Sequence, residues 1–244
     1  MNTLVSIAPS HYCEKTRWSL ELAEISFTEQ IHVPFFHVSA VKKVGGTRSA
    51  PVLKTDSALL DDSTLITQWI AQQSNIAWSP FGHTENEKER SQHWEHELGR
   101  KLGVLTRLVA YHHLLPAKQK IQHCMQRAPH TEQQWFGWGY PIFAWMMRRG
   151  MNINAKSAQQ ATKSIWKIFE DIEQNVTGEY LVGNQLTIAD LTLAALSAPL
   201  ILPAKYGAPL PSLEDIPVSA KDLCLKLRAH PTGQRVLRLY DNWR

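Results

Sequence analysis

Apolar residues in the N-terminal part of the chain follow the periodicity of strands. Short runs of strand-like composition fall at residues 4–7 and 27–33, and a pair of short strands is expected at 51–54 and 58–61. The pattern assigns no element to residues 34–49, where a Gly-Gly pair indicates a turn. This part of the chain is therefore predicted to contain a small sheet.

A helix is expected to begin at Ser10, soon after the first strand. Its apolar residues recur at helical spacing on one face and are Trp18, Leu22 and Ile25. Its charged residues fall outside that face and are Glu14, Lys15 and Glu21. The pattern is typical of an amphipathic helix packed on a sheet.

A second helix is predicted after the fourth strand, where Ser63 is expected to be the cap and Asp62 its acidic neighbour. Its apolar residues are Leu65, Ile66, Trp69 and Ile70. The order of strand, helix, strand, strand, strand and helix is that of thioredoxin-like folds. It occupies residues 1–75, the length of one small domain.

After a linker at residues 75–84 the pattern becomes helical throughout. The expected helices span residues 85–115, 118–147, 158–176, 219–228 and 231–240. The second of them is expected to be interrupted near Pro129 and at 137–141, because Pro and Gly disfavour a helix interior. The predicted fold class is an α/β thioredoxin-like N-terminal domain, residues 1–75, followed by an all-α C-terminal helical bundle, residues 84–244.

The most specific local motif of the helical part lies between Thr187 and Asp190. Thr187 is expected to cap an apolar helix, and Asp190, three residues later, to accept a hydrogen bond from the cap residue. This is an acidic capping box, and it fixes where that helix begins.

Charge and composition narrow the class of protein. The chain of 244 residues is 43% hydrophobic and 20% charged, which indicates a packed structure along nearly its whole length. The net charge is +4, and residues 1–74 hold six basic against seven acidic residues, so the excess lies in the helical part. A modest surplus spread over helices does not form the basic face that nucleic-acid binding needs, and no nucleic-acid partner is expected.

Cysteine usage and the absence of a visible signal segment suggest a cytoplasmic protein. The three cysteines are Cys13, Cys124 and Cys224; they are far apart in sequence and form no C-x-x-C pair, which favours a reducing compartment. The apolar run 191–203 is too short to span a bilayer and reads as a buried helix, so no membrane partner is expected.

The turn from the first strand into the first helix is the leading candidate for chemistry. Ser10 can cap the first free amides of the helix, and these amides together with the helix dipole can stabilise an anion in front of them. Tyr12 and Cys13 lie in the first turn and are the other candidate catalytic residues. The Ala50-Pro51 link, where a proline enters a strand, is a candidate cis peptide.

The segment Ser10-His11-Tyr12-Cys13 resembles the C-P-Y-C helix start of glutaredoxins with the first cysteine replaced by serine, as in many glutathione transferases. Three further motifs follow in the order that this family shows: Ala50-Pro51, Asp62-Ser63 and the capping box of Thr187 and Asp190. Each motif alone is weak evidence, but four motifs in this order are strong evidence for the resemblance. The chain thus resembles the glutathione transferase family over nearly its whole length.

The resemblance implies a function and a set of site residues. Glutathione is the implied co-substrate, with Ser10 donating a hydrogen bond to its thiolate and a small hydrophobic electrophile as the second substrate. The implied glutathione-binding residues are Ala50, Pro51, Asp62 and Ser63, with Arg48 and His37 as weaker partners for its glycine carboxylate. The family also implies a homodimer and a role in detoxification.

Two alternative functions remain open at this point. Cys13 could serve a glutathione-dependent thiol-disulfide oxidoreductase, although its position in the helix favours a buried structural thiol. The chain could also be a non-catalytic binding protein with this fold. Metal chemistry is not expected, because His93 and His96 lack a third ligand at a suitable spacing.

Several aromatic residues of the helical part are candidates to line the pocket of the second substrate, although helix packing alone explains most of them. They are Tyr111, Trp135, Trp138, Tyr140 and Phe143.

Overall fold

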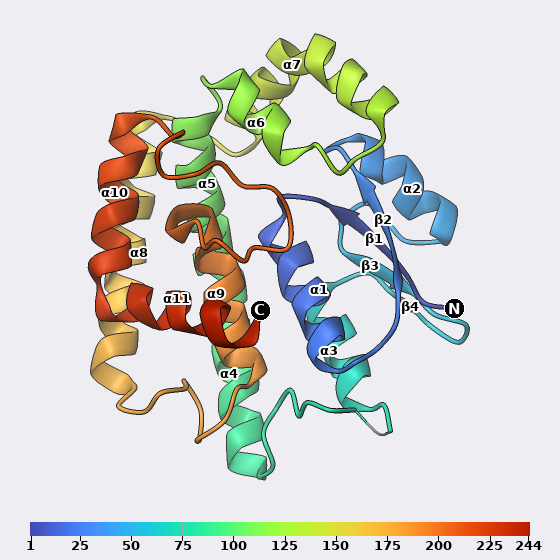
Figure 1. Cartoon of the computed structure of the whole chain (residues 1–244), viewed down its shortest axis with the longest axis vertical. Coiled ribbons are helices and arrows are strands. Elements are labelled where there is room, and N and C mark those ends of the chain that lie inside the picture. Colours follow the sequence, from blue (N-terminus) through green and yellow to red (C-terminus); the bar gives the residue numbers. More distant parts are fainter. Residues whose placement is uncertain (75) are drawn as a thin grey trace.

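The computed structural model describes residues 1–74 and 76–244 and has a mixed sheet beside a larger group of helices (Figure 1). Asn75, where the expected linker begins and the expected first domain ends, lies outside the described residues. The N-terminal elements are β1 (Thr3–Ile7), α1 (His11–Leu22), β2 (Thr28–His32), α2 (Phe36–Val44), β3 (Val52–Lys54), β4 (Leu59–Leu60) and α3 (Ser63–Ala71). The four strands pair in the order β2-β1-β3-β4, with β1 parallel to β2 and the remaining pairs antiparallel.

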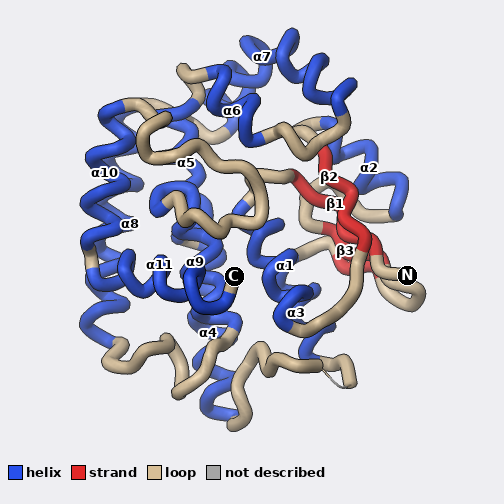
Figure 2. Tube along the Cα trace, viewed as in Figure 1, coloured by secondary structure: helices blue, strands red, loops and turns tan. Residues whose placement is uncertain are grey.

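The remaining elements are all helices, as Figure 2 shows by colour. They are α4 (Glu85–Arg100), α5 (Leu102–Leu114), α6 (Lys118–Cys124), α7 (His130–Gly150), α8 (Ala155–Asn175), α9 (Ile188–Ile201), α10 (Val218–Ala229) and α11 (Pro231–Trp243). The predicted fold class, a thioredoxin-like α/β part followed by a helical part, is therefore confirmed.

The capping box places α9 at the centre of the helical part. Asp190 accepts hydrogen bonds from the Thr187 amide and hydroxyl, both at 3.0 Å, and from the Leu181 amide at 2.8 Å. Nearly every residue of α9 is buried, and α1, α4, α5, α10 and α11 all pack against it. The predicted motif thus fixes the start of the helix around which the main apolar core forms.

The expectation that the charged residues of α1 lie outside its buried face is wrong for two of them. Glu14 is fully buried and Lys15 is 2% exposed, because α1 is covered by the sheet on one side and by α9 on the other. Each charge has a partner: Glu14 accepts from Arg17 Nη1 at 2.7 Å and Arg244 Nε at 2.9 Å, and Lys15 Nζ lies 2.5 Å from Glu95 Oε1. Burial of these charges is tolerated because each is paired.

Four local expectations also need correction. Residues 36–44 form α2, where the sequence pattern predicts no element. Asp62, not Ser63, caps α3: it has extended backbone angles and its Oδ1 accepts from the Thr64 amide at 2.7 Å, while Ser63 is the first helical residue. The helix expected at 85–115 is divided at Lys101 into α4 and α5.

The fourth correction concerns α7, which continues through 137–141 although Pro141 lies inside it. The face formed by Phe136, Tyr140, Phe143 and Ala144 is buried in an apolar cluster separate from the main core. Packing of this face offsets the helix-breaking cost of the proline, since tertiary contacts supply most of the stability of helices in proteins.

Helices α6 and α7, residues 118–150, form a separate layer at the top of the molecule in Figure 1, and we call this pair the roof. Their cluster includes Leu115 at the end of α5 and Val33 just after β2. Glu132 in the first turn of α7 fixes the roof to the sheet: its carboxylate accepts from His32 Nδ1 at 2.7 Å and from the Val33 amide at 2.9 Å.

Candidate functional site

The start of α1 is built as the sequence predicts. Ser10 has extended backbone angles, and its Oγ accepts a long hydrogen bond, 3.4 Å, from the Cys13 amide. Ser10 is half-buried, and the first amides of a helix lack intrahelical acceptors. The peptide bond between Ala50 and Pro51 is cis, as proposed from the sequence.

Two depressions meet beside Ser10. The first is a cavity of about 300 Å³ beneath the roof, and it contains Ser10 and His37. The second, of about 370 Å³, is a polar groove that runs from Tyr12 along Ala50 and Pro51 to Asp62 and Ser63 at the start of α3. The residues that line both are Tyr12, Ser49, Ala50 and Arg107. We call these two depressions the cavity and the groove.

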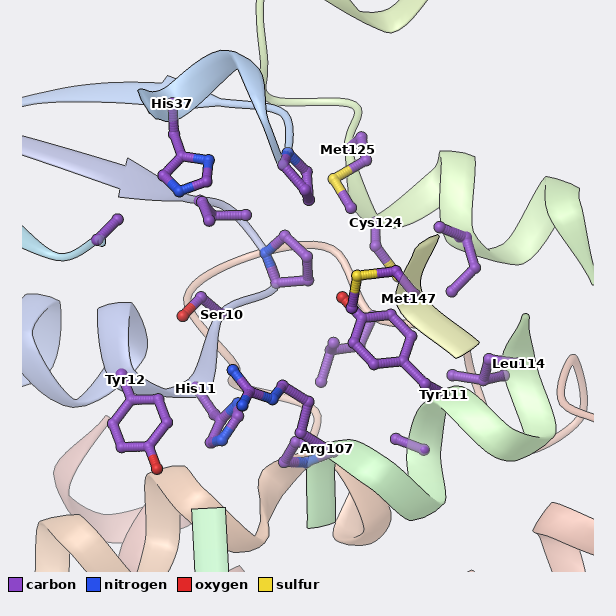
Figure 3. Close-up of a pocket in the computed structure, with 18 of the residues that line it drawn as sticks. Ser10, His11, Tyr12, His37, Arg107, Tyr111, Leu114, Cys124, Met125 and Met147 are labelled. Atoms are coloured by element: carbon purple, nitrogen blue, oxygen red, sulfur yellow. The ribbon is translucent and has the colours of Figure 1, made fainter. Parts of the chain in front are cut away.

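The cavity is walled mainly by apolar side chains from distant segments, as Figure 3 shows. Tyr111 and Leu114 come from α5, and Met125 and Met147 come from the roof. Such a lining suits a hydrophobic ligand, and the volume is at the lower end of the range for small-molecule sites.

Arg107 brings a positive charge to the junction of the two depressions. It rises from α5, and in Figure 3 its guanidinium lies between His11 and Ser10. Its Nε is buried, and none of the described residues accepts a hydrogen bond from that atom. Because Arg107 lines both depressions, its guanidinium charge can attract an anionic ligand at the junction.

His11 is buried and uncharged beneath this site. Burial and the neighbouring Arg107 charge lower the pKa of its imidazole to about 3, which outweighs the opposite effect of its hydrogen bond to the Gly103 carbonyl. His11 Nε2 lies 2.9 Å from that carbonyl oxygen, so the neutral ring donates from Nε2. His11 therefore ties α1 to α5.

Tyr12 has a similar interdomain contact. Its hydroxyl donates to the Gly99 carbonyl at 2.7 Å, so its proton is already engaged. Burial raises the pKa of Tyr12, which keeps it a neutral donor. In this geometry Tyr12 shapes the junction and holds α4 against α1.

Cys13 is fully buried and lines neither depression. Its sulfur accepts a weak hydrogen bond from the Ile7 amide at 3.4 Å. Burial raises the pKa of this thiol despite the amide and hydroxyl contacts that favour the thiolate. These features are those of a structural thiol.

Of the weaker candidates, one lies at the site and one does not. His37 lines the cavity, and its Nδ1 accepts from the Phe35 amide at 3.1 Å; burial lowers its pKa. Arg48 is exposed and lies outside the groove and the cavity as the described residues define them.

The aromatic candidates for the second pocket divide in the same way. Tyr111 lines the cavity, and Tyr140 and Phe143 are buried inside the roof cluster. Trp135 and Trp138 are 61% and 78% exposed on the outer side of α7, so they do not line the cavity.

Sequence reasoning missed Arg107, His11 and the roof residues of the cavity. Arg107 lies on the side of its helix opposite the apolar stripe of Leu102, Leu105 and Val109, which in isolation indicates a solvent-facing position. In the fold that side faces the junction instead. Nothing in the local sequence marks Met125 or Met147 as neighbours of a residue near the start of the chain.

The described residues contain no group of three or more His, Cys, Asp or Glu side chains that could hold a metal ion. Within the same residues, no helix is long and apolar enough to cross a membrane.

Solved structures with a similar fold are numerous but distant in sequence. The beta-etherase LigF from Sphingobium sp. is 16% identical, with a TM-score of 0.64 over 97% of this chain and 98% of that one. A glutathione transferase from Populus trichocarpa is 14% identical, with a TM-score of 0.60 over 98% of each chain. A theta class glutathione S-transferase from Xanthomonas axonopodis pv. citri, solved with glutathione bound, is 15% identical, with a TM-score of 0.57 over 97% of this chain and 96% of that one.

Family comparisons agree with the fold. None of the curated proteins compared with the chain matches it significantly. The model of the glutathione S-transferase N-terminal domain matches residues 4–80, and the model of the C-terminal domain of the same family matches residues 140–215. The two matches together take in more than half of the 244 residues. The chain therefore belongs to the glutathione S-transferase family.

Proposed function

We propose that this protein binds glutathione in the groove, stabilises its thiolate beside Ser10, and transfers it to a hydrophobic electrophile seated in the cavity. The observation that carries the proposal is the meeting of a polar groove and an apolar cavity beside the N-terminus of α1. A tripeptide and an apolar second substrate can then approach each other at one point.

The groove offers partners for each part of glutathione. The amides at the start of α3 and the Ser63 hydroxyl suit the γ-glutamyl carboxylate, and Asp62 Oδ2 suits the ammonium because Oδ1 is already bonded to the Thr64 amide. The backbone of Ala50 lines the groove and suits the cysteinyl residue. His37 and Arg107 are the nearer candidates for the glycine carboxylate, in place of exposed Arg48.

Activation requires only a lower pKa for the glutathione thiol, which is about 8.5 in a free cysteine. The Ser10 hydroxyl accepts from the Cys13 amide and can still donate its own proton to the sulfur. The helix N-terminus and the Arg107 charge favour the thiolate further. The thiolate lone pair then forms the carbon–sulfur bond as the leaving group departs from the electrophile.

The test compares substitutions at Ser10 and Cys13, which are three residues apart. Ser10→Ala is expected to lower kcat/KM for conjugation of a chlorodinitrobenzene-type substrate by about 100-fold, the loss typical of one essential donor, whereas Cys13→Ser changes it little. The opposite ranking, with disulfide reductase activity lost in Cys13→Ser, would favour an oxidoreductase. Calorimetric titration that detects no glutathione binding would leave only a binding or scaffold role with another ligand.

By its family the protein is further proposed to be a cytoplasmic homodimer that acts in detoxification. Sedimentation velocity of the purified chain tests the assembly.

A further inference from the structure

Helix α7 is apolar on two faces, although only one is buried. The inner face packs into the roof cluster. The outer face of α7 consists of Trp135, Trp138, Ile142, Trp145 and Met146, which are 61%, 78%, 65%, 62% and 42% exposed. A helix that is apolar on all sides is normally buried, so the exposure of the outer face is unusual for its composition.

The five side chains form one continuous stripe. Their spacing of three or four residues stacks them along one side of the helix over about three turns. The Trp135 and Trp138 rings contact each other edge to face, with centroids 5.5 Å apart. Each indole leaves on the order of 100 Å² or more in water, so the stripe reaches the size at which exposed apolar patches mark interaction sites.

The roof that carries the stripe holds more basic than acidic residues. Residues 118–150 contain five Lys and Arg against one acidic residue, Glu132; Lys120 is paired with Asp215, and Arg127 lies 3.7 Å from Glu29. Glu132 is 15% exposed and is already bonded to His32 and the Val33 amide. Arg148 and Arg149 end α7 and are exposed, with Arg149 one turn beyond Trp145 on the same side.

We propose that the outer face of α7 docks on an anionic lipid bilayer surface. The indoles would lie at the level of the headgroups, where aromatic rings with one polar edge are favoured, and Arg148 and Arg149 would contact lipid phosphates. Charge complementarity distinguishes this occupant from a second copy of the chain, because two copies meeting through this face would bring two basic regions together.

This contact is peripheral and is compatible with the lack of a membrane-crossing helix among the described residues. The expectation of no membrane partner rests on the lack of a segment able to cross a bilayer, and a peripheral contact does not need one. The roof also contributes Met125 and Met147 to the cavity, so docking would bring the cavity close to the bilayer, which can supply apolar electrophiles. That last step rests on the proposed function; the docking itself does not.

The experiment uses the full chain with vesicles of phosphatidylcholine alone or mixed with phosphatidylglycerol. We expect cosedimentation with the mixed vesicles, a blue shift of tryptophan emission, and loss of both as salt is raised. Trp138→Ser/Trp145→Ser is expected to lower the partition coefficient at least tenfold, roughly what loss of two buried indoles implies. Arg148→Gln/Arg149→Gln is expected to lower it about 10- to 30-fold at low salt.

Val218→Ser is the matched control, because Val218 is 84% exposed on α10, away from the stripe, and its substitution should leave partitioning unchanged. Absence of cosedimentation with mixed vesicles would overturn the proposal, as would equal partitioning of the wild type and the double tryptophan variant. A dimer that the tryptophan substitutions dissociate, without vesicle binding, would instead make the stripe an interface between copies.

Glutathione titration of the same variants separates this proposal from the previous one. None of the substituted residues lines the groove or the cavity, so each variant is expected to bind glutathione as the wild type does, which also reports an intact fold. A chain that binds vesicles but not glutathione would support docking and refute the proposed function. A chain that binds glutathione but not vesicles would refute docking and support the proposed function.

Discussion

Lys15 Nζ and Glu95 Oε1 lie 2.5 Å apart at the boundary between α1 and α4, and their side chains are only 2% and 3% exposed. Removing one partner of such a buried pair leaves an uncompensated charge. Lys15→Met is therefore expected to lower the free energy of unfolding by about 3–5 kcal/mol. Urea denaturation measures this loss.

The double variant Lys15→Met/Glu95→Met provides the decisive comparison, because replacing both charges by apolar groups is often nearly neutral. Recovery of most of the lost stability is expected. Lys226→Met is the control: Lys226 and Asp222 form a pair whose members are 65% and 67% exposed, and a change below about 1 kcal/mol is expected there. Equal losses for the buried and the exposed pair would contradict this account.

Protonation of His11 should link stability to pH. The unfolded imidazole has a pKa of about 6.5, whereas the pKa in the fold is about 3. Between these values the unfolded chain binds a proton that the folded chain does not. Stability is therefore expected to fall as the pH decreases from about 6.5, by up to about 1.4 kcal/mol per pH unit.

His11→Gln keeps a donor for the Gly103 carbonyl without this titration. Denaturant unfolding of both proteins between about pH 5 and 7 is the measurement, since most carboxylates stay ionised there. The free energy of unfolding of the wild type should change more steeply with pH than that of His11→Gln. Parallel pH dependences would mean that His11 is not the group responsible.

Gly103 is required where α5 meets α1. A Cβ at this position would overlap the Tyr12 hydroxyl and lie 2.7 Å from its ring carbon Cζ. Gly103→Ala is expected to destabilise the fold by about 1–3 kcal/mol through this overlap. Thermal unfolding followed by circular dichroism checks the loss.

Gly99 supplies a matched control one turn earlier, because a Cβ there meets nothing among the described residues. Gly99→Ala should raise stability by about 0.5–1 kcal/mol, as expected for a helical Gly-to-Ala change. If both variants lost stability equally, helix geometry rather than contact with Tyr12 would be the cause.

Arg107 should tune the glutathione thiol. Its guanidinium lies at the junction of the groove and the cavity beside Ser10, where the sulfur is proposed to bind. Arg107→Met is expected to raise the pKa of the bound thiol by about one unit, measured by thiolate absorbance across a pH titration. Arg100→Met is the comparison, because Arg100 lines only the groove and should alter affinity instead. An unshifted thiol pKa in Arg107→Met would rule out this role.

The parts of the site that sequence could predict are those fixed by short-range rules. A serine after a strand caps a helix, a proline enters a strand through a cis link, and Thr187 with Asp190 begins α9. Each depends on residues a few positions apart, so a local pattern suffices.

What sequence could not predict depends on distant segments that meet only in the fold. In sequence, Lys15 has the pattern of a solvent-facing residue, but in the fold it lies 2.5 Å from Glu95. Arg107 has the same pattern, but in the fold it lines the cavity and the groove. The uninterrupted course of α7 through Pro141 likewise follows from a tertiary cluster that no local rule contains.

The roof has its own apolar cluster and meets the sheet through Glu132, while the groove is framed by α1, α3 and the Ala50-Pro51 link. Much of it, residues 118–139, also falls between the stretches that the two family models match. Exchanging roof residues should therefore reshape the acceptor chamber while tripeptide affinity stays nearly constant, since changes at well-separated positions act independently. Under the proposed function, selectivity for the electrophile and recognition of glutathione would then be separable properties of one chain.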